Sequence, residues 1–237
     1  ITSPNMAISD EKLHGPSIDN NLRGMLSMSP FSSRCCQHNH GMGWPYYAEH
    51  LVMATSDNGL ATMLYAANET TAKVGAEGRS VRLIEDTEYP FEEKVTLTIR
   101  TDGDGVSFPL YLRIPAWSDK TAVSVNGESV SAAGATGKYV RIEREWQDGD
   151  KVELEMPMSF TSQVWQQNKS SVSVNYGPMT LSLKIKENFE QHDSRDPYFV
   201  QDDSHWQDGV DASLWPCYVL KPESDWNYAL KVDKSFI

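Results

Sequence analysis

Apolar and polar residues alternate along the chain from about residue 60 to residue 190. The alternation is cleanest over residues 95–99 and 152–156, and a period of two is typical of strands with one buried face. Turn-forming dipeptides separate such segments, among them Asp102-Gly103, Asn126-Gly127 and Asp148-Gly149. Because no helical pattern intervenes, the sequence predicts a mainly β fold with an antiparallel β-sandwich over residues 59–190.

The segments on either side of this region have different patterns. Residues 1–43 are rich in glycine, proline and asparagine and show no sustained periodicity, which predicts an irregular connection. Pro45 then suits the first position of a helix, and apolar residues at helical spacing continue to Ala54. We therefore expect one helix of about three turns that ends near Asp57. Residues 191–237 are rich in aromatic and acidic residues and are expected to form ordered loops on the sandwich.

The charge of the chain narrows the choice of partners. The 237 residues carry a formal net charge of −12, which would repel a phosphate backbone, so nucleic acid is not an expected partner. No apolar run is long enough to span a membrane. Neutral ligands such as sugars remain possible partners, because the ten tyrosines and seven tryptophans offer flat apolar faces with polar edges.

The stretch SRCCQHNHGMGWPYYAEH, residues 33–50, holds the densest candidate chemistry. Cys35 and Cys36 are adjacent, and adjacent cysteines rarely bond to each other because the geometry of such a disulfide is poor. Thiolates are nucleophiles and zinc ligands, and His38 and His40 are the local residues that could complete a four-ligand site. A bare Cys-Cys pair lacks the usual spacing of a zinc motif, so buried, inert thiols are the alternative interpretation.

Other candidates carry less information. The carboxylates of Asp86, Glu88, Glu92 and Glu93 flank Tyr89-Pro90-Phe91, and sequence alone does not say whether any two of them converge as an acid and a base.

Several segments together resemble one known family. They are RCCQHNHGMGWPYYAEHL, NGLATMLYA, EDTEYPFEEKVTLTI, FPLYLRIPAW, YVRIEREWQDGDKVELEMPM and VSVNYGPMTLSLKI. In this order they resemble the β-L-arabinofuranosidase family of glycoside hydrolases, family 127, over most of the chain. The resemblance implies an (α/α)₆ catalytic barrel followed by β-sandwich domains. Residues 1–58 would then be the C-terminal remnant of that barrel, with the Cys-Cys loop and one helix.

The resemblance also implies roles for the cysteines. Cys35 would be a zinc-bound thiolate nucleophile and Cys36 a zinc ligand. The remaining ligands, a glutamate and a further cysteine, and the general acid would come from barrel segments upstream of residue 1. The implied reaction is retaining, through a thioglycosyl intermediate. The residues after the cysteine pair depart from the family pattern, so His38, Asn39 and His40 either line the sugar pocket or brace the loop.

These observations lead to one main expectation and one alternative. The chain is expected to be part of an extracellular or periplasmic hydrolase of arabinofuranoside-type or related plant glycans. Its partners would be an oligosaccharide or polysaccharide substrate and the missing catalytic barrel segment, and the isolated chain would be inactive. The alternative is a non-catalytic β-sandwich, either structural or carbohydrate-binding through Trp165, Trp206 and Trp215. Trp117 and Trp146 are expected to lie in the core.

Overall fold

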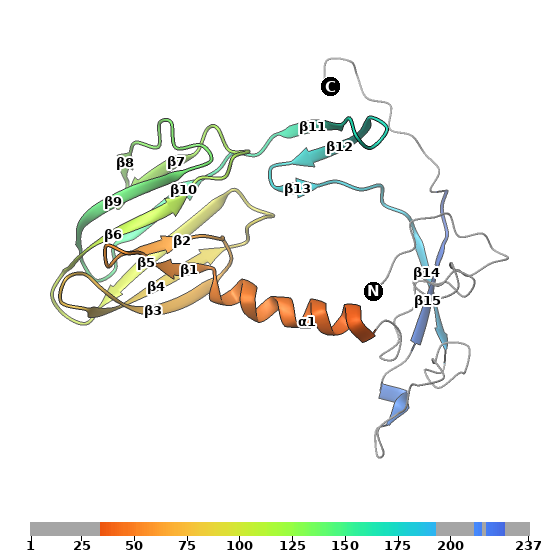
Figure 1. Ribbon diagram of the computed structural model, residues 1–237, viewed down its shortest axis with the longest axis horizontal. Coiled ribbons are helices and arrows are strands. Elements are labelled where there is room, and N and C mark those ends of the chain that lie inside the picture. Colours follow the sequence, from red (N-terminus) through yellow and green to blue (C-terminus); the bar gives the residue numbers. More distant parts are fainter. Residues whose placement is uncertain (1–33, 193–210, 215–216, 226–237) are drawn as a thin grey trace. The chain divides into compact units, whose positions relative to one another are not determined.

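The computed structural model describes residues 34–192, 211–214 and 217–225 (Figure 1). Within these residues the chain is mainly β, with one long helix and a short 3₁₀ helix, Ala212–Leu214, which confirms the predicted fold class. The described residues divide into two units, one of residues 45–182 and the other of residues 34–44 with 183–192, 211–214 and 217–225.

The first unit contains two sheets that share one hydrophobic core. The smaller sheet has the strand order β1–β2–β6–β9, made of β1 (Val52–Ala54), β2 (Leu60–Thr62), β6 (Val106–Arg113) and β9 (Tyr139–Trp146). The larger has the order β3–β4–β5–β10–β7–β8, made of β3 (Asn68–Val74), β4 (Arg79–Thr87), β5 (Lys94–Thr101), β10 (Lys151–Glu155), β7 (Ala122–Val125) and β8 (Glu128–Val130). Figure 1 shows these strands gathered in one body.

Strand pairing in the sandwich is antiparallel with one exception. β2 pairs parallel with β6, with Leu60 opposite Leu110. The three strands that follow β2 in the chain, β3, β4 and β5, all belong to the other sheet. The chain therefore returns to β6 by a crossover, and a crossover allows the parallel pairing that a short hairpin cannot make.

The core is built from the inward positions of the alternating strands. Val95, Leu97 and Leu154 are fully buried, as the period of two predicted. Trp146 is also fully buried, and its indole Nε1 donates a hydrogen bond to the carbonyl oxygen of Phe108 at 2.9 Å. Trp117 is partly buried against the same core. The expectation that these tryptophans belong to the core is confirmed for Trp146, whereas Trp117 lies at the edge of the core.

The strands after residue 156 do not extend either sandwich sheet. The last core residue is Met156, and Pro157, which has no N–H to donate to a ladder, follows it. The next strands form a separate sheet of β11 (Phe160–Trp165), β12 (Ser171–Tyr176) and β13 (Met179–Thr180), and a two-stranded ladder pairs β14 (Glu187–His192) with β15 (Cys217–Pro222). The two sheets of the sandwich therefore end well before residue 190.

The position of the expected helix is wrong. Helix α1 spans Arg34–Glu49, so Pro45 lies inside it rather than at its first position, and part of the expected irregular segment is helical. Beyond the helix, β1 pairs with β2 around a tight turn in which Asn58 has a φ of 61°. Leu51 and Ala54 therefore match a helical spacing by coincidence, because the nearby turn folds this segment into a hairpin.

Candidate functional site

Helix α1 carries all five predicted site residues in its first two turns. Cys35 and Cys36 lie in the first turn, and His38, Asn39 and His40 follow within the next. Positions three and four apart on a helix are neighbours on its surface, so this register places the histidine and asparagine positions beside the cysteine positions. The side chains of residues 34–40 lie outside the part of the chain that is described.

The cysteine pair offers the type of ligand that zinc binds, but fewer ligands than a zinc site needs. Zinc takes sulfur and imidazole ligands, and a structural or catalytic site has about four ligands, at least three of them from protein. Across the described residues, no group of three or more histidine, cysteine, aspartate or glutamate side chains could hold a metal ion. By themselves, Cys35 and Cys36 are two sulfur ligands, fewer than a zinc site takes from protein.

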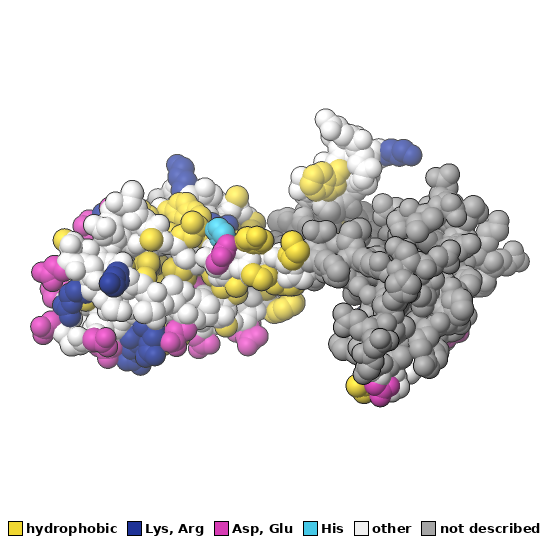
Figure 2. All heavy atoms as spheres, turned by 60° about the horizontal axis from the view of Figure 1, so that its bottom comes forward, with side chains coloured by type: hydrophobic (Ala, Val, Ile, Leu, Met, Phe, Trp, Pro, Cys, Tyr) yellow, Lys and Arg dark blue, Asp and Glu magenta, His cyan; other side chains and the backbone are white. Residues whose placement is uncertain are grey.

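The second half of α1 exposes large apolar side chains. Met42, Trp44 and Tyr46 are each more than half exposed, and every residue from 41 to 50 is classed as exposed. Figure 2 shows hydrophobic side chains gathered toward one end of the described surface. Helices of soluble proteins normally bury an apolar stripe, so this composition is typical of a helix that packs against further protein.

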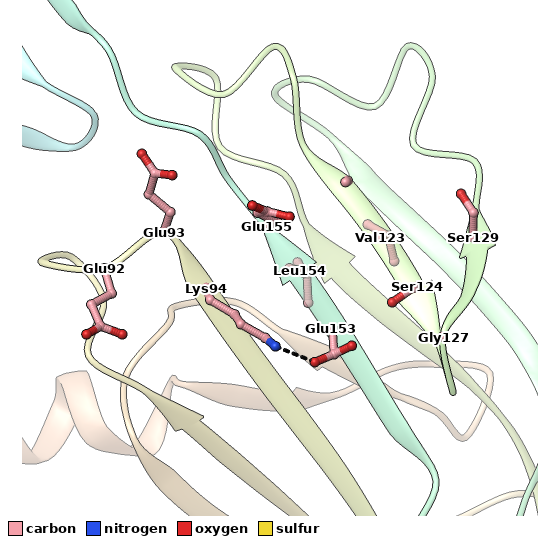
Figure 3. A pocket seen from close by; sticks show the side chains of 11 residues that line it. Glu92, Glu93, Lys94, Val123, Ser124, Gly127, Ser129, Glu153, Leu154 and Glu155 are labelled. Carbon is pink, nitrogen blue, oxygen red and sulfur yellow. Dashed lines mark ion pairs between the residues drawn. The ribbon is translucent and has the colours of Figure 1, made fainter.

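The carboxylates around residue 90 do not form a visible acid and base pair. Asp86, Glu88 and Glu92 are exposed, whereas Glu93 Oε1 accepts a hydrogen bond from the Met158 amide at 2.7 Å. Figure 3 shows the side chains of Glu92 and Glu93 pointing away from each other. Glu93 is therefore engaged in holding the segment that leaves the sandwich.

Glu92 and Glu93 line an open hollow of about 620 Å³ across β5, β10 and β7 (Figure 3). Glu153 and Glu155 also line it, and Lys94 Nζ lies 2.5 Å from Glu153 Oε1. No aromatic residue is among its lining residues. The hollow is therefore acidic and lacks the flat rings on which sugars stack.

The tryptophans of the alternative interpretation are only partly described. Trp165 is about half exposed, and its Nε1 donates to Ser173 Oγ at 3.1 Å. Trp206 and Trp215 lie outside the described residues. Of the three tryptophans expected to bind carbohydrate, the structure therefore describes only Trp165.

Sequence reasoning missed a buried carboxyl group. Glu85 is only 2% exposed, and its two carboxylate oxygens accept hydrogen bonds from the Ala66 amide at 3.0 Å and from Asn68 Nδ2 at 3.1 Å. Burial raises the pKa of Glu85 to about 7, against the lowering effect of these hydrogen bonds. The alternation of Val81, Leu83 and Glu85 along β4 was the signal, because it places Glu85 on the inner face.

A second missed cluster lies on the smaller sheet. Asp57 accepts hydrogen bonds from Thr55 Oγ1 at 2.5 Å and from Tyr111 Oη at 2.6 Å, and Arg141 lies 3.4 Å away. The bond from Thr55, followed by those from Tyr111 and Arg141, lowers the pKa of Asp57 to about 2. These polar groups satisfy one another at the surface, so the cluster stabilises the β1–β2 turn and its neighbours.

The sandwich matches the model of one protein family. The family model of the GH127 middle domain of β-L-arabinofuranosidases matches residues 59–158. This segment is therefore similar to the middle domain of GH127 enzymes. The matched segment contains every sandwich strand except β1 and does not include α1 or its cysteines.

Solved GH127 structures resemble a larger part of the chain. A GH127 β-L-arabinofuranosidase from Geobacillus stearothermophilus T6 is 25% identical, with a TM-score of 0.56 over 81% of this chain and 35% of its own. A second GH127 β-arabinofuranosidase is 20% identical, with a TM-score of 0.52 over 76% of this chain and 34% of its own. The chain thus spans about a third of the length of these GH127 relatives. No curated protein matches it.

The described part of the chain contains no helix that is both long enough and apolar enough to cross a membrane.

Proposed function

We propose that this chain is part of a retaining GH127 glycoside hydrolase that cleaves arabinofuranoside-type or related plant glycans outside the cytoplasm, in an extracellular or periplasmic space. The observation that carries the proposal is the match of residues 59–158 to the GH127 middle domain, preceded closely by a helix with two adjacent cysteines in its first turn. The similar protein from Geobacillus stearothermophilus T6 is a β-L-arabinofuranosidase, which supports this substrate class.

In this proposal the first turn of α1 supplies the nucleophile. The sulfur of Cys35 attacks the anomeric carbon as the bond from that carbon to the leaving-group oxygen breaks, and the general acid protonates that oxygen. Water then cleaves the thioglycosyl intermediate, which releases the sugar with retention of configuration and returns the Cys35 thiolate. The N-terminal end of a helix favours negative charge, so the position of Cys35 suits a thiolate. Cys36 serves with Cys35 as a zinc ligand, and bound zinc would keep both thiols deprotonated at neutral pH.

The general acid and the remaining ligands belong, in this proposal, to a catalytic barrel segment outside these 237 residues. Two observations support such a partner. The chain spans about a third of its GH127 relatives, and the exposed apolar residues of α1 need a covering surface.

His38, Asn39 and His40 are proposed to contact the sugar. Imidazole and amide groups donate and accept hydrogen bonds, as sugar hydroxyls require, and their helical positions neighbour those of the cysteines. Alanine substitutions should raise KM more than they lower kcat if these residues bind the substrate. Unchanged kinetic constants would indicate that they only brace the helix.

The experiment that tests the proposed function uses the protein from the complete natural gene. Zinc content and hydrolysis of an aryl β-L-arabinofuranoside are measured for the unchanged protein and for Cys35→Ser, Cys36→Ser and Cys217→Ser. We expect about one zinc per chain, its loss in Cys36→Ser and at least a thousandfold lower kcat in Cys35→Ser. Cys217, from β15, is the matched control and should change neither. Full activity in Cys35→Ser would contradict the proposal.

A non-catalytic carbohydrate-binding role is the second candidate, because Trp165 is about half exposed. Oligosaccharide binding that is lost in Trp165→Ala and unaffected in Cys35→Ser would favour it over the hydrolase.

A further inference from the structure

Glu85 connects the interior of the sandwich to the loop between β2 and β3. Its Oε1 accepts from the Ala66 amide, and its Oε2 accepts from Asn68 Nδ2, which also donates to the Ala66 carbonyl at 2.8 Å. One carboxylate oxygen therefore holds the β2–β3 connection, residues 63–67, and the other holds Asn68, the first residue of β3.

The β2–β3 connection also holds the chain that leaves α1. The amide of Met63 donates to the carbonyl of Leu51 at 2.8 Å, and Leu51 is buried two residues after the helix ends. Tyr65, in the same connection, is buried and donates from its hydroxyl to the Arg113 carbonyl at 2.6 Å. Anything that loosens the connection therefore also loosens the anchor of Leu51.

The described part of the chain supplies no cationic partner for the Glu85 carboxyl. Across the described residues, no ion pair of a lysine, arginine or histidine with Glu85 is found. Neighbouring strands oppose it with Asn68 on β3 and Leu97 on β5, both uncharged. The titratable or charged groups around this end of the sandwich are Tyr65, Tyr89 beyond the end of β4, and Arg113 at the end of β6. The Nε of Arg113 is engaged by the Met63 carbonyl.

From this geometry we propose that Glu85 is a pH-sensitive latch on the β2–β3 connection. When the carboxyl is protonated, it sits without charge in the core and holds the connection closed. When the proton leaves to solvent, a buried negative charge remains that no cation of the described residues pairs with, and the free energy of opening the connection to water falls because opening hydrates that charge. The raised pKa of Glu85, about 7, places this change near neutral pH. The latch does not depend on the proposed hydrolase activity.

Hydrogen exchange of single amides in the 237-residue chain tests the latch. Protection factors, corrected for the intrinsic pH dependence of exchange, are compared at pH 5.5 and pH 8 for Ala66 and Met63. We expect both to fall about tenfold at pH 8, because local opening releases a carboxylate with an ordinary pKa. Amides of β5 and β10, in the centre of the larger sheet, should change much less.

Two variants separate the latch from a general effect of pH. Glu85→Gln removes the charge and keeps a similar volume, so the difference between the two pH values should shrink to less than twofold. Asp86→Asn, exposed on the opposite face of the same strand, is the matched control and should behave like the unchanged chain. An equal loss of protection in Glu85→Gln would overturn the proposal.

A measurement on the unchanged chain guards against a variant that does not fold. The carboxyl carbon of Glu85 is followed by NMR in ¹³C-labelled protein as the pH is varied. A titration midpoint between about pH 6 and 8 supports the latch. A midpoint below pH 5 would show that the buried carboxyl is charged at neutral pH without consequence, and the latch would be wrong. Neither outcome depends on whether the protein hydrolyses glycans.

Discussion

At the scale of single residues, Trp146 shows how a motif residue can be structural. Its indole fills the core and satisfies the Phe108 carbonyl, and its ring centroid lies 5.8 Å from that of Phe108. We expect Trp146→Phe to lower the free energy of unfolding by about 2 to 4 kcal/mol, because it leaves a cavity and a buried carbonyl without its donor. Urea unfolding measures this. Trp165→Phe, on an exposed surface, should cost less than about 0.5 kcal/mol, and equal costs would contradict the assignment of Trp146 to the core.

Asp57 gives a pH dependence with a definite sign. Its pKa is lowered to about 2 in the folded chain, so the folded state binds fewer protons than the unfolded state between about pH 4 and pH 2. Its contribution to stability is therefore fully present above pH 4 and is lost as the pH falls toward 2. In Asp57→Asn this part of the dependence should disappear from urea unfolding measured at several pH values. A steep acid loss that persists unchanged would assign it to other carboxylates.

The candidate site residues differ in whether the sequence alone is enough to recognise them. The adjacent pair Cys35-Cys36 stands out in the sequence because its chemistry is carried by residue type alone. Glu85 looks like any other carboxylate until strand alternation is followed through β4. The donors that hold Glu85 come from the β2–β3 connection and the first residue of β3, about twenty residues earlier in the chain, so only the folded backbone reveals them.

At the scale of elements, the β1–β2 hairpin depends on a close approach of two backbones. A Cβ atom at Gly59 would lie 2.1 Å from the Pro109 carbonyl oxygen, which belongs to β6. We expect Gly59→Ala to lower the free energy of unfolding by more than about 2 kcal/mol, since backbone must move to accept it. Gly41→Ala, in helix α1 where a Cβ would meet nothing within 4 Å beyond the adjacent residues and the backbone of the helix itself, should be neutral or stabilising. Thermal unfolding of both variants measures the contrast, and a neutral Gly59→Ala would mean that β2 and β6 do not pair as described.

The strands could be predicted from sequence far better than the helix. Alternation over 95–99 and 152–156 directly reports one buried face, and both segments are strands of the larger sheet. Helix α1 begins at Arg34, in a polar segment whose apolar residues have no helical period, so pattern alone gives no sign of it. The parallel β2–β6 pair was equally hidden, because strand order depends on which sheet the intervening strands join.

At the scale of the whole molecule, the 237-residue chain by itself should be inactive. The proposed acid and the additional ligands lie outside it, and the first-turn cysteines supply only two of about four donors. We expect no measurable hydrolysis of an aryl arabinofuranoside by the purified chain under conditions in which the product of the complete gene turns over. Zinc bound at equilibrium with a competing chelator should also be much weaker in the chain alone. Turnover by the isolated chain would require every catalytic group to lie within these residues.

The stability of the whole chain should pass through a maximum near pH 4 to 5. On the acid side, Asp57 loses its contribution as the pH falls below 4. On the alkaline side, the pKa of Glu85 is raised from 4.5 to about 7, so the folded state binds more protons than the unfolded state in this interval. The contribution of Glu85 is therefore fully present below pH 4.5 and is lost as the pH rises through 7, by at most about 3 kcal/mol.

The net charge of the chain also lowers stability as the pH rises, so its effect must be distinguished from that of Glu85. At pH 7 the chain carries a charge of −12, and self-repulsion of this charge also lowers stability. Repulsion between exposed charges is screened by salt, whereas burial of the Glu85 carboxyl is not. Urea unfolding from pH 4.5 to pH 8 is therefore measured at 0.05 M and 0.5 M sodium chloride. If the loss persists in high salt and vanishes in Glu85→Gln, the buried carboxyl causes it; if salt removes the loss, surface repulsion does.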